Sequence, residues 1–422
     1  MTETVRSRAQ TWCIAALVLA LLAGVFLRLP QPLFSGERAL LAAFQSLHPP
    51  PKFSNVGFDE GLYRQYVNSV ALVGLGSYPE IVEQYREKQK TLPGSILPPV
   101  RFLYIFAAYA WHSLFGTEAL AALHCVASTF SILTLGLAAF FAWRLKGLAF
   151  AAGVTALTAF APTQIHMSQH ALVDGFFTFW ALLSLWLLWE NLRAPGNWRW
   201  AAAYVVALAL MVLTKENSFF VWVAIVALLV ANRWLRFGTV TRELVIATVL
   251  GPFLGVVVLV FLAGGVGDLI TTYQLSTSKN FTLNYAILTG DGPWHRYLVD
   301  LLLISPVILL LAIGGVFLLK REQRADWFLA GFIGASYLVM CNVKYGLNLR
   351  YANMWDVPLR MLAVGTIVTI AGKLPRFQQA FIVSVVALIS VFELRQYLIL
   401  FVDYPLYELV SEGLLRALHI LK

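Results

Sequence analysis

The sequence has little charge and little cysteine for its length. Only 13% of its 422 residues are charged, whereas 59% are hydrophobic. Soluble domains are about one quarter charged and about half apolar, so these values exclude an ordinary soluble domain. The three cysteines, Cys13, Cys125 and Cys341, all lie in or beside apolar segments. An odd, dispersed set of this kind indicates neither a disulfide framework nor a cysteine metal site.

The sequence also lacks the patterns typical of outer-membrane β-barrels and of nucleic-acid-binding proteins. The apolar runs are long and show no ten-residue alternation, so helices are expected rather than an outer-membrane β-barrel. The net charge of +9 is not gathered into a basic patch with interleaved aromatic residues, so no nucleic-acid partner is expected. The sequence therefore predicts an all-α polytopic membrane protein whose surroundings are membrane lipids.

Eleven segments are apolar enough to cross a bilayer as helices, some of them near the lower limit of roughly 17 residues. The predicted spans are 11–29, 118–143, 147–161, 173–192, 198–213, 217–234, 243–264, 298–319, 326–342, 356–372 and 378–401. The first of them is expected to be a retained anchor, because no small-residue cleavage site follows it.

Basic residues concentrate at alternate junctions between these spans. The residues at these junctions are Arg6, Arg8, Arg144, Lys146, Arg193, Arg199, Arg233, Arg236, Arg242, Lys320, Arg321, Arg324, Lys373 and Arg376. The positive-inside rule places them in the cytoplasm, which gives a cytoplasmic N-terminus and an external C-terminus in an inner or plasma membrane. The apolar segment 100–116 would invert this pattern as a span, so it is predicted to be an interfacial helix or one packed at membrane depth.

A single transmembrane domain is expected over residues 1–401. The predicted external parts are the first loop 30–117, with helices at 59–75 and from Ser77 to about Lys90, the second loop 265–297 and the amphipathic tail 402–422. The order Ser-Tyr-Pro-Glu at 77–80 predicts a capping box at the start of the second of these helices.

Three carboxylates lie on the external side at predicted helix starts. Asp59 and Glu60 are adjacent in the first external loop, and Asp174 opens the fourth span. An acid at this position can simply cap a helix, which is worth about 1 kcal/mol. The alternative is catalysis, because one carboxylate suffices as the general base for an acceptor hydroxyl.

Cations are scarce in the short external loops, yet Lys344 and Arg350 fall within seven positions and Tyr351 follows. Snorkelling to lipid phosphates is one interpretation, and a dedicated phosphate site is the other, because the guanidinium fork suits phosphate oxygens. Lys215 has two similar interpretations: a local ion pair with Glu216, or a contact to an anionic ligand.

The histidines raise the question of a metal. His166, His170 and Asp174 are spaced i, i+4 and i+8, so a continuous helix would place them on one face, where they could bind a divalent cation. His295 follows Gly-Pro-Trp in the second external loop and is a further candidate ligand. A divalent metal is thus a candidate cofactor.

The carboxylates and cations are predicted to face one external compartment. Nucleotide sugars and ATP are cytoplasmic, so an enzyme acting outside needs another activated donor, and a polyprenyl-phosphate sugar would supply one. Phosphate leaves readily if positive charge is near, and the acceptor hydroxyl needs only a base. One carboxylate and a few cations are sufficient for this chemistry.

Six sequence elements, in order, also resemble those of a known family. They are "FDEG", "LPPVRFLYIFAAYAWHSLFGTEALAALH", "SQHALVDGFF", "LTKEN", "GPWHRYLVDLLLISP" and "KYGLNLRY". Over about residues 1–372 the chain resembles the C-type (GT-C) glycosyltransferases, in the group of dolichyl-phosphate-mannose protein mannosyltransferases and bacterial aminoarabinose transferases. It departs from them after Tyr351, where "ANMWDVP" replaces the common leucine-rich run.

The resemblance implies the GT-C fold and an inverting transfer from a polyprenyl-phosphate sugar to a hydroxyl on a glycan, lipid or protein. It implies that Asp59 is the catalytic base, with Glu60 as its neighbour and Asp174 as the second acid. The lipid-phosphate contacts would fall on Lys344, Arg350 and Tyr351, beside Lys215.

Two other functions use some of the same residues. A transporter of lipid-linked sugars would need ionisable residues along a path near the bilayer midplane, whereas most charges here lie at span ends. A surface-polysaccharide polymerase or ligase would depend mainly on Arg and His of a later external loop, so it would not need Asp59. The sequence specifies neither the sugar nor the acceptor.

Overall fold

The computed structural model describes residues 3–34, 39–49, 57–281, 283–344 and 346–421, with side chains from residue 10 onward. Arg6 and Arg8 therefore lie outside the described side chains. Within these ranges every regular element is a helix, as predicted. The longer helices are α1 (Glu3–Arg28), α2 (Phe58–Val73), α3 (Tyr78–Thr91), α4 (Phe102–Phe115), α5 (Ala119–Lys146), α6 (Leu148–Ala159), α8 (Val173–Arg193), α9 (Trp198–Val212), α10 (Ser218–Leu235), α11 (Arg242–Ala263), α12 (Val266–Asn280), α15 (Pro306–Phe317), α16 (Arg324–Met340), α17 (Asp356–Ala371) and α18 (Gln378–Tyr397).

Shorter helical turns connect them, and several shape the site. They are α7 (Pro162–Ser168), α13 (Asn284–Gly290), α14 (Arg296–Ile304), α19 (Ser411–Ala417) and the 3₁₀-helix η4 (Leu349–Trp355).

Seven described helices are long and apolar enough to cross a membrane, and an eighth span is formed if the bent pair α6 and α7 counts as one. The predicted number of eleven is therefore not confirmed. The predicted span 147–161 corresponds to α6, and the chain bends by 61° just after it, where Pro162 opens α7, because proline cannot continue the preceding hydrogen-bond ladder. The predicted span 298–319 is likewise divided at Ser305, just before Pro306.

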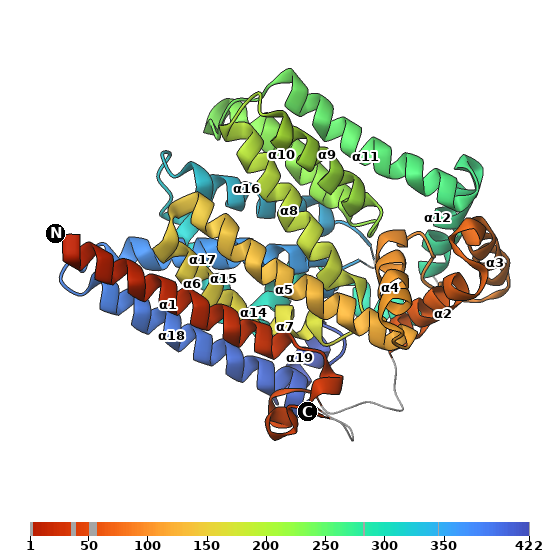
Figure 1. The fold of residues 1–422 in the computed structure, drawn as a ribbon, viewed down its shortest axis with the longest axis horizontal. Coiled ribbons are helices and arrows are strands. Elements are labelled where there is room, and N and C mark those ends of the chain that lie inside the picture. The colour runs from red at the N-terminus through yellow and green to blue at the C-terminus, as the bar shows by residue number, and fades with distance from the viewer. Residues whose placement is uncertain (1–2, 35–38, 50–56, 282, 345, 422) are drawn as a thin grey trace.

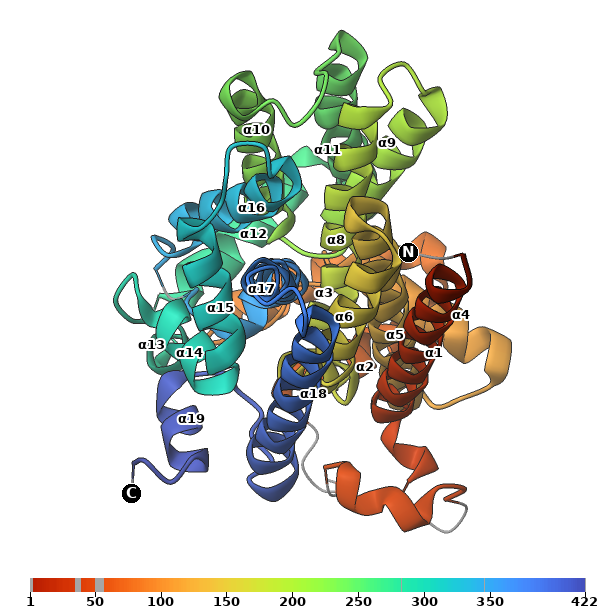
Figure 2. The ribbon, with the colours of Figure 1, turned by 90° about the vertical axis from the view of Figure 1, so that its left-hand side faces the viewer.

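α17 runs through the middle of the bundle, where Figure 2 shows it nearly end-on. It packs against α6, α15, α16 and α18. Met361, Ala363 and Val364 are among its fully buried side chains. α9, α10 and α11 lie together on one side of the bundle, whereas α1 and α18 lie on the other (Figure 1). The interior position of α17 is the one expected for a helix that is apolar on nearly all faces.

The segment between α1 and α5 forms a separate layer of helices. α2, α3 and α4 gather with α12 at one end of the molecule, away from the N-terminus (Figure 1). They share an apolar cluster that includes Tyr63, Val67, Tyr104 and Ile105. α4 has 14 residues, which is about 21 Å of helix and too short for a bilayer core of about 30 Å. Its length agrees with the prediction that 100–116 does not span.

One local prediction is wrong. Ser77 makes no side-chain capping bond at α3, so the predicted capping box is absent there. Pro79 follows at the second helical position, where a missing N–H costs nothing. The tail begins in the π-helix η5 (Leu398–Asp403) and is helical again over α19, whereas residues 404–410 between them have no helical structure.

Candidate active site

A cavity of about 280 Å³ opens at the end of the bundle where α2, α12, α13 and η4 meet. Apolar side chains form much of its wall. The charged and phenolic residues that line it include Asp59, Arg101, Glu216, Lys344, Arg350 and Tyr351. An apolar hollow with a few convergent charged groups is the usual form of a ligand site.

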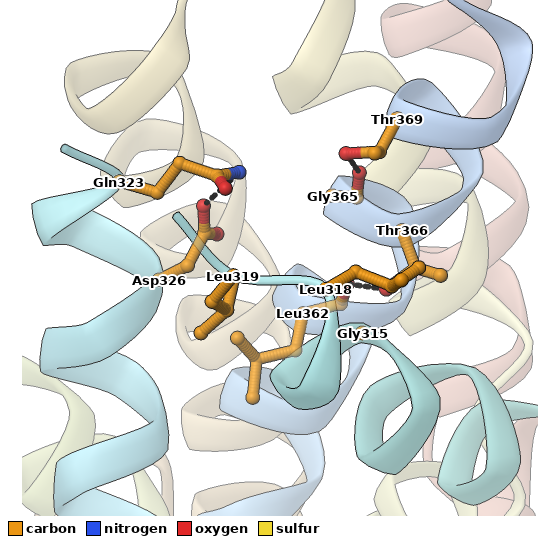
Figure 3. Close-up of a pocket in the computed structure, with 9 residues that line it drawn as sticks. All are labelled: Gly315, Leu318, Leu319, Gln323, Asp326, Leu362, Gly365, Thr366 and Thr369. Carbon is orange, nitrogen blue, oxygen red and sulfur yellow. Dashed lines mark hydrogen bonds between the residues drawn. The ribbon is translucent and has the colours of Figure 1, made fainter. Parts of the chain in front are cut away.

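A second, much smaller pocket lies near the opposite end of α16 and α17. Its volume is about 10 Å³. Figure 3 shows Gln323 turned toward Asp326, while Thr366 and Thr369 hydrogen-bond to carbonyls of their own helix. Lys146 binds both oxygens of Asp326, at 2.6 and 2.7 Å. This pocket has room for about one water molecule, so it is no candidate for a substrate.

Arg350 is the centre of the charged groups in the large cavity. The Asn348 side chain caps η4 by accepting the Arg350 N–H at 3.0 Å, which fixes the backbone there. The guanidinium donates to Asp59 Oδ2 and to Glu408 Oε1, both at 3.0 Å. Its Nε lies 3.7 Å from Asp174 Oδ2. Three carboxylates from distant parts of the chain thus converge on one buried arginine.

Asp59 and Glu60 are adjacent in sequence but lie in different environments. Asp59 lines the cavity and faces Arg350, and it does not cap α2. Glu60 points away from the cavity and accepts the N–H of Gly57 at 2.9 Å. It also accepts the N–H of Ala171 at 2.7 Å. Of the two acids, Glu60 is therefore the one that caps the helix.

His170 Nδ1 lies 3.3 Å from the carboxylate of Glu60. Burial raises the pKa of Glu60, but the hydrogen bonds from His170 and the Ala171 amide outweigh it and lower the pKa to about 2. Glu60 is thus held ionised and fastens α2 to the segment between α7 and α8.

Asp174 and Lys215 form a buried ion pair behind the cavity wall. The side chains of Lys215 and Asp174 are 1% and 3% exposed, and neither residue lines the cavity. Lys215 Nζ lies 4.1 Å from the centre of the Tyr351 ring, a cation–π contact. Lys215 does not form the local pair with Glu216 that was one interpretation of the sequence. Glu216 instead binds Arg101.

Lys344 is exposed and lines the same cavity as Arg350. The predicted phosphate-binding residues are therefore placed in two groups. Lys344, Arg350 and Tyr351 face the cavity, whereas Lys215 supports it from behind.

The predicted metal site is not assembled. α7 ends at Ser168, so His170 and Asp174 do not continue its helical face. His166 stacks on Phe401 with ring centres 4.2 Å apart. His295 lies beside Trp294 at the start of α14. Within the described part of the chain, no three His, Cys, Asp or Glu side chains form a cluster that could hold a metal.

Sequence analysis missed two charged pairs that the fold brings to the site. Arg101, just before α4, binds Glu216 and donates to the Tyr63 hydroxyl at 2.7 Å. Glu408, in the tail, binds Arg350. The only sequence signal for Arg101 was a charge at the start of an apolar helix, and Glu408 was one acid in a segment predicted to be interfacial.

Residues 103–264 match the model of the family described as dolichyl-phosphate-mannose-protein mannosyltransferase. No curated protein matches the chain in sequence.

Solved structures match over nearly the whole chain. ArnT from Cupriavidus metallidurans in the apo state is 14% identical, with a TM-score of 0.52 over 97% of this chain and 76% of ArnT. The oligosaccharyltransferase of Archaeoglobus fulgidus in its apo form is 13% identical, with a TM-score of 0.60 over 92% of this chain and 56% of that chain.

The same archaeal enzyme, AglB, in complex with an inhibitory peptide and a dolichol-phosphate, has a TM-score of 0.57 at 13% identity, over 92% of this chain and 55% of that chain. The present chain thus spans just over half the length of the archaeal oligosaccharyltransferase. At these identities the structures show the fold alone. The chain has the fold of the membrane-embedded C-type glycosyltransferases, and its residues 103–264 match the protein mannosyltransferase family.

Proposed function

We propose that this protein is an inverting glycosyltransferase that moves a sugar from a polyprenyl-phosphate donor to an acceptor hydroxyl. The observation that carries the proposal is the pairing of Asp59 with Arg350 at 3.0 Å on the wall of one cavity. A carboxylate beside a guanidinium provides a base and an anion site within a few ångströms. The family match and the dolichol-phosphate bound to the archaeal neighbour support a lipid-linked donor.

In the proposed reaction, the acceptor oxygen attacks the anomeric carbon of the sugar from the face opposite the phosphate. The bond between that carbon and the phosphate oxygen breaks, and its electron pair leaves with the polyprenyl phosphate. Asp59 takes the proton of the acceptor hydroxyl. Arg350 and Lys344 stabilise the charge that develops on the leaving phosphate.

Asp174 and Lys215 have a different role in this scheme. Neither lines the cavity, but Asp174 lies 3.7 Å from Arg350 and Lys215 lies over Tyr351. They hold Arg350 and Tyr351 in position from behind. Asp174 therefore acts as a positioning residue for the phosphate site, whereas Asp59 lines the cavity beside Arg350 and is placed to receive a proton from an acceptor.

The donor set does not fit a divalent cation held by the protein. Asp174 is bound by Lys215, and Asp59 by Arg350. The predicted ligands His166 and His295 lie in other contacts, as described above. The reaction is therefore written with Arg350 and Lys344 as the charge stabilisers.

The placement of the charges supports an external site. Asp59, Asp174, Lys215 and Arg350 lie at the helix ends opposite those that carry most of the basic junction residues. The positive-inside rule assigns those basic ends to the cytoplasm, so the proposed site faces the external or periplasmic side. A flipped lipid-linked sugar is available there.

Purified protein in nanodiscs, supplied with a panel of synthetic polyprenyl-phosphate sugars and candidate acceptors, tests this function. Sugar transfer with inverted anomeric configuration, seen by NMR of the product, is the expected result. Mass spectrometry of lipid-linked sugars that accumulate in a deletion strain selects the panel. Absence of transfer from every donor that accumulates would contradict the proposal.

A further inference from the structure

The C-terminal segment 404–410 reaches the proposed phosphate site, although it follows the last long helix. Leu409 is fully buried, and its carbonyl accepts the N–H of Leu349 at 3.3 Å. Tyr407 packs so closely on the start of α2 that a Cβ added at Gly57 would lie 2.5 Å from the Tyr407 hydroxyl. The segment is therefore built into the site.

Glu408 of this segment binds Arg350 together with two uncharged partners. One of its oxygens accepts from Arg350 at 3.0 Å and from the Tyr285 hydroxyl of α13. The other oxygen accepts from the Asn348 side chain at 2.6 Å. Tyr285, Asn348 and Arg350 all line the cavity, so Glu408 lies directly behind the surface that a ligand would touch.

The charges around Arg350 create a conflict with an incoming phosphate. The guanidinium of Arg350 is already surrounded by carboxylates: Nη2 binds Asp59, Nη1 binds Glu408, and Asp174 lies 3.7 Å from Nε. A polyprenyl-phosphate sugar brings one further negative charge. Like charges in a poorly solvated cluster repel strongly, so binding requires that one carboxylate give up its place on Arg350.

Glu408 can leave Arg350 at the lowest cost of the three. Asp174 stays bound because Lys215 holds it, and Asp59 is needed beside the acceptor. Glu408 keeps hydrogen bonds from Asn348 and Tyr285 after it leaves the guanidinium. A carboxylate that retains such donors avoids most of the penalty for an unpaired buried charge.

We infer that Glu408 holds the place of the donor phosphate on Arg350 and is replaced by that phosphate when the donor binds. This inference rests on the proposed function. It assigns the C-terminal segment a part in donor binding, with a lipid-linked phosphate as the ligand. Glu408 thereby tunes the affinity of Arg350 and acts as a positioning residue rather than a catalytic one.

The test uses the full chain in nanodiscs and a short-chain polyprenyl phosphate without sugar as the probe. Glu408→Gln keeps the shape of the side chain and removes its charge. We expect it to bind the probe roughly threefold to tenfold more tightly than the wild type, because one competing charge is gone. Tyr285→Phe removes one of the donors that displaced Glu408 keeps, so it should weaken the binding of the probe.

Glu412→Gln is the matched control, because Glu412 lies in the same tail, is exposed and pairs with Arg416. It should leave the affinity unchanged. If Glu408 has only a structural role, Glu408→Gln should lower the melting temperature without tightening the binding of the probe.

Arg350→Ala separates failure of this inference from failure of the proposed function. Suppose that Arg350→Ala binds the probe more weakly than the wild type, while the binding by Glu408→Gln is unchanged or weaker. This result would overturn the role of Glu408, and the phosphate site would still be supported. Unchanged binding by Arg350→Ala would overturn both.

Discussion

Arg350 and Arg360 are two buried arginines, ten positions apart in sequence, and each is bound by carboxylates. Arg360, in α17, binds Asp356 one turn earlier and Glu393 of α18 at 2.7 Å. Its remaining donor reaches the Leu157 carbonyl of α6 at 3.0 Å. Arg360 and Glu393 are 0% exposed, and neither lines the large cavity.

The difference between the two arginines lies in access and in the origin of their partners. The partners of Arg360 come from helices of the bundle, and the network connects α6, α17 and α18. The partners of Arg350 come from α2, α8 and the C-terminal segment, and Arg350 itself faces the cavity. A buried ion network alone therefore does not mark an active site, whereas one that borders a cavity is available to a ligand.

The largest expected effect is that of Asp59→Asn. The change keeps the shape of the side chain and removes its ability to accept a proton. If Asp59 is the base, turnover should fall by on the order of 10² to 10⁴ with an almost unchanged melting temperature. Transfer from a synthetic polyprenyl-phosphate sugar, measured beside a melting curve, tests this. Near-normal turnover would remove Asp59 from catalysis.

Arg360→Ala should have the largest effect on stability. Its loss leaves Asp356 and Glu393 as uncompensated buried charges, which typically costs about 3–5 kcal/mol. The expected result is a large drop in melting temperature, whereas the protein that remains folded binds polyprenyl phosphate normally. A normal melting temperature together with loss of polyprenyl-phosphate binding would contradict this contrast, because it would assign Arg360 a role in binding rather than in stability.

Arg350→Ala should weaken donor binding more than acceptor binding. Loss of a charge-assisted phosphate contact costs on the order of 1.5–3 kcal/mol, which is roughly tenfold to a hundredfold in affinity. Arg350→Lys is the companion variant, because it keeps the charge but loses the fork, and it should recover part of the affinity. Apparent donor and acceptor constants from transfer assays separate the two effects. Unchanged donor affinity would assign Arg350 a structural role only.

Glu60→Gln should have the smallest effect on transfer, within a few-fold, because Glu60 does not face the cavity. Its effect on stability should depend on pH. The pKa of about 2 in the folded state lies below the ordinary value of 4.5, so the ionised form stabilises the fold above pH about 4.5. This stabilisation is lost as the pH falls toward about 2.

Melting curves of wild type and Glu60→Gln should therefore differ at pH 7 and converge near pH 2. A difference that does not depend on pH would contradict the role of Glu60 as an ionised cap.

Local sequence patterns predicted the parts of this site but not their assembly. The helical membrane class, α2, α3 and a separate apolar helix at α4 follow from composition, periodicity and charge placement. Asp59 and Arg350 were each recognisable as unusual charges on one side of the membrane. The two residues are nearly 300 positions apart in sequence but form a pair at 3.0 Å. No local sequence pattern contains information about such a distant contact.

The errors have equally physical causes. Hydropathy sums do not detect a helix break, so the predicted span 298–319, which is interrupted before Pro306, appeared continuous. Helical spacing predicted a shared face for His166 and Asp174, but the helix ends at Ser168 between them. Glu408 was missed because its partners come from other segments of the chain.

The most direct test of the central claim is photo-crosslinking with a polyprenyl phosphate that carries a photoreactive group near the phosphate. Mass spectrometry of the labelled protein locates the site. We predict that the label is found on peptides that line the large cavity, such as 340–351 and 273–290. Arg350→Ala should abolish this labelling. Labelling of α17 and α18 around Arg360, or labelling unaffected by Arg350→Ala, would contradict the assignment of the cavity as the donor site.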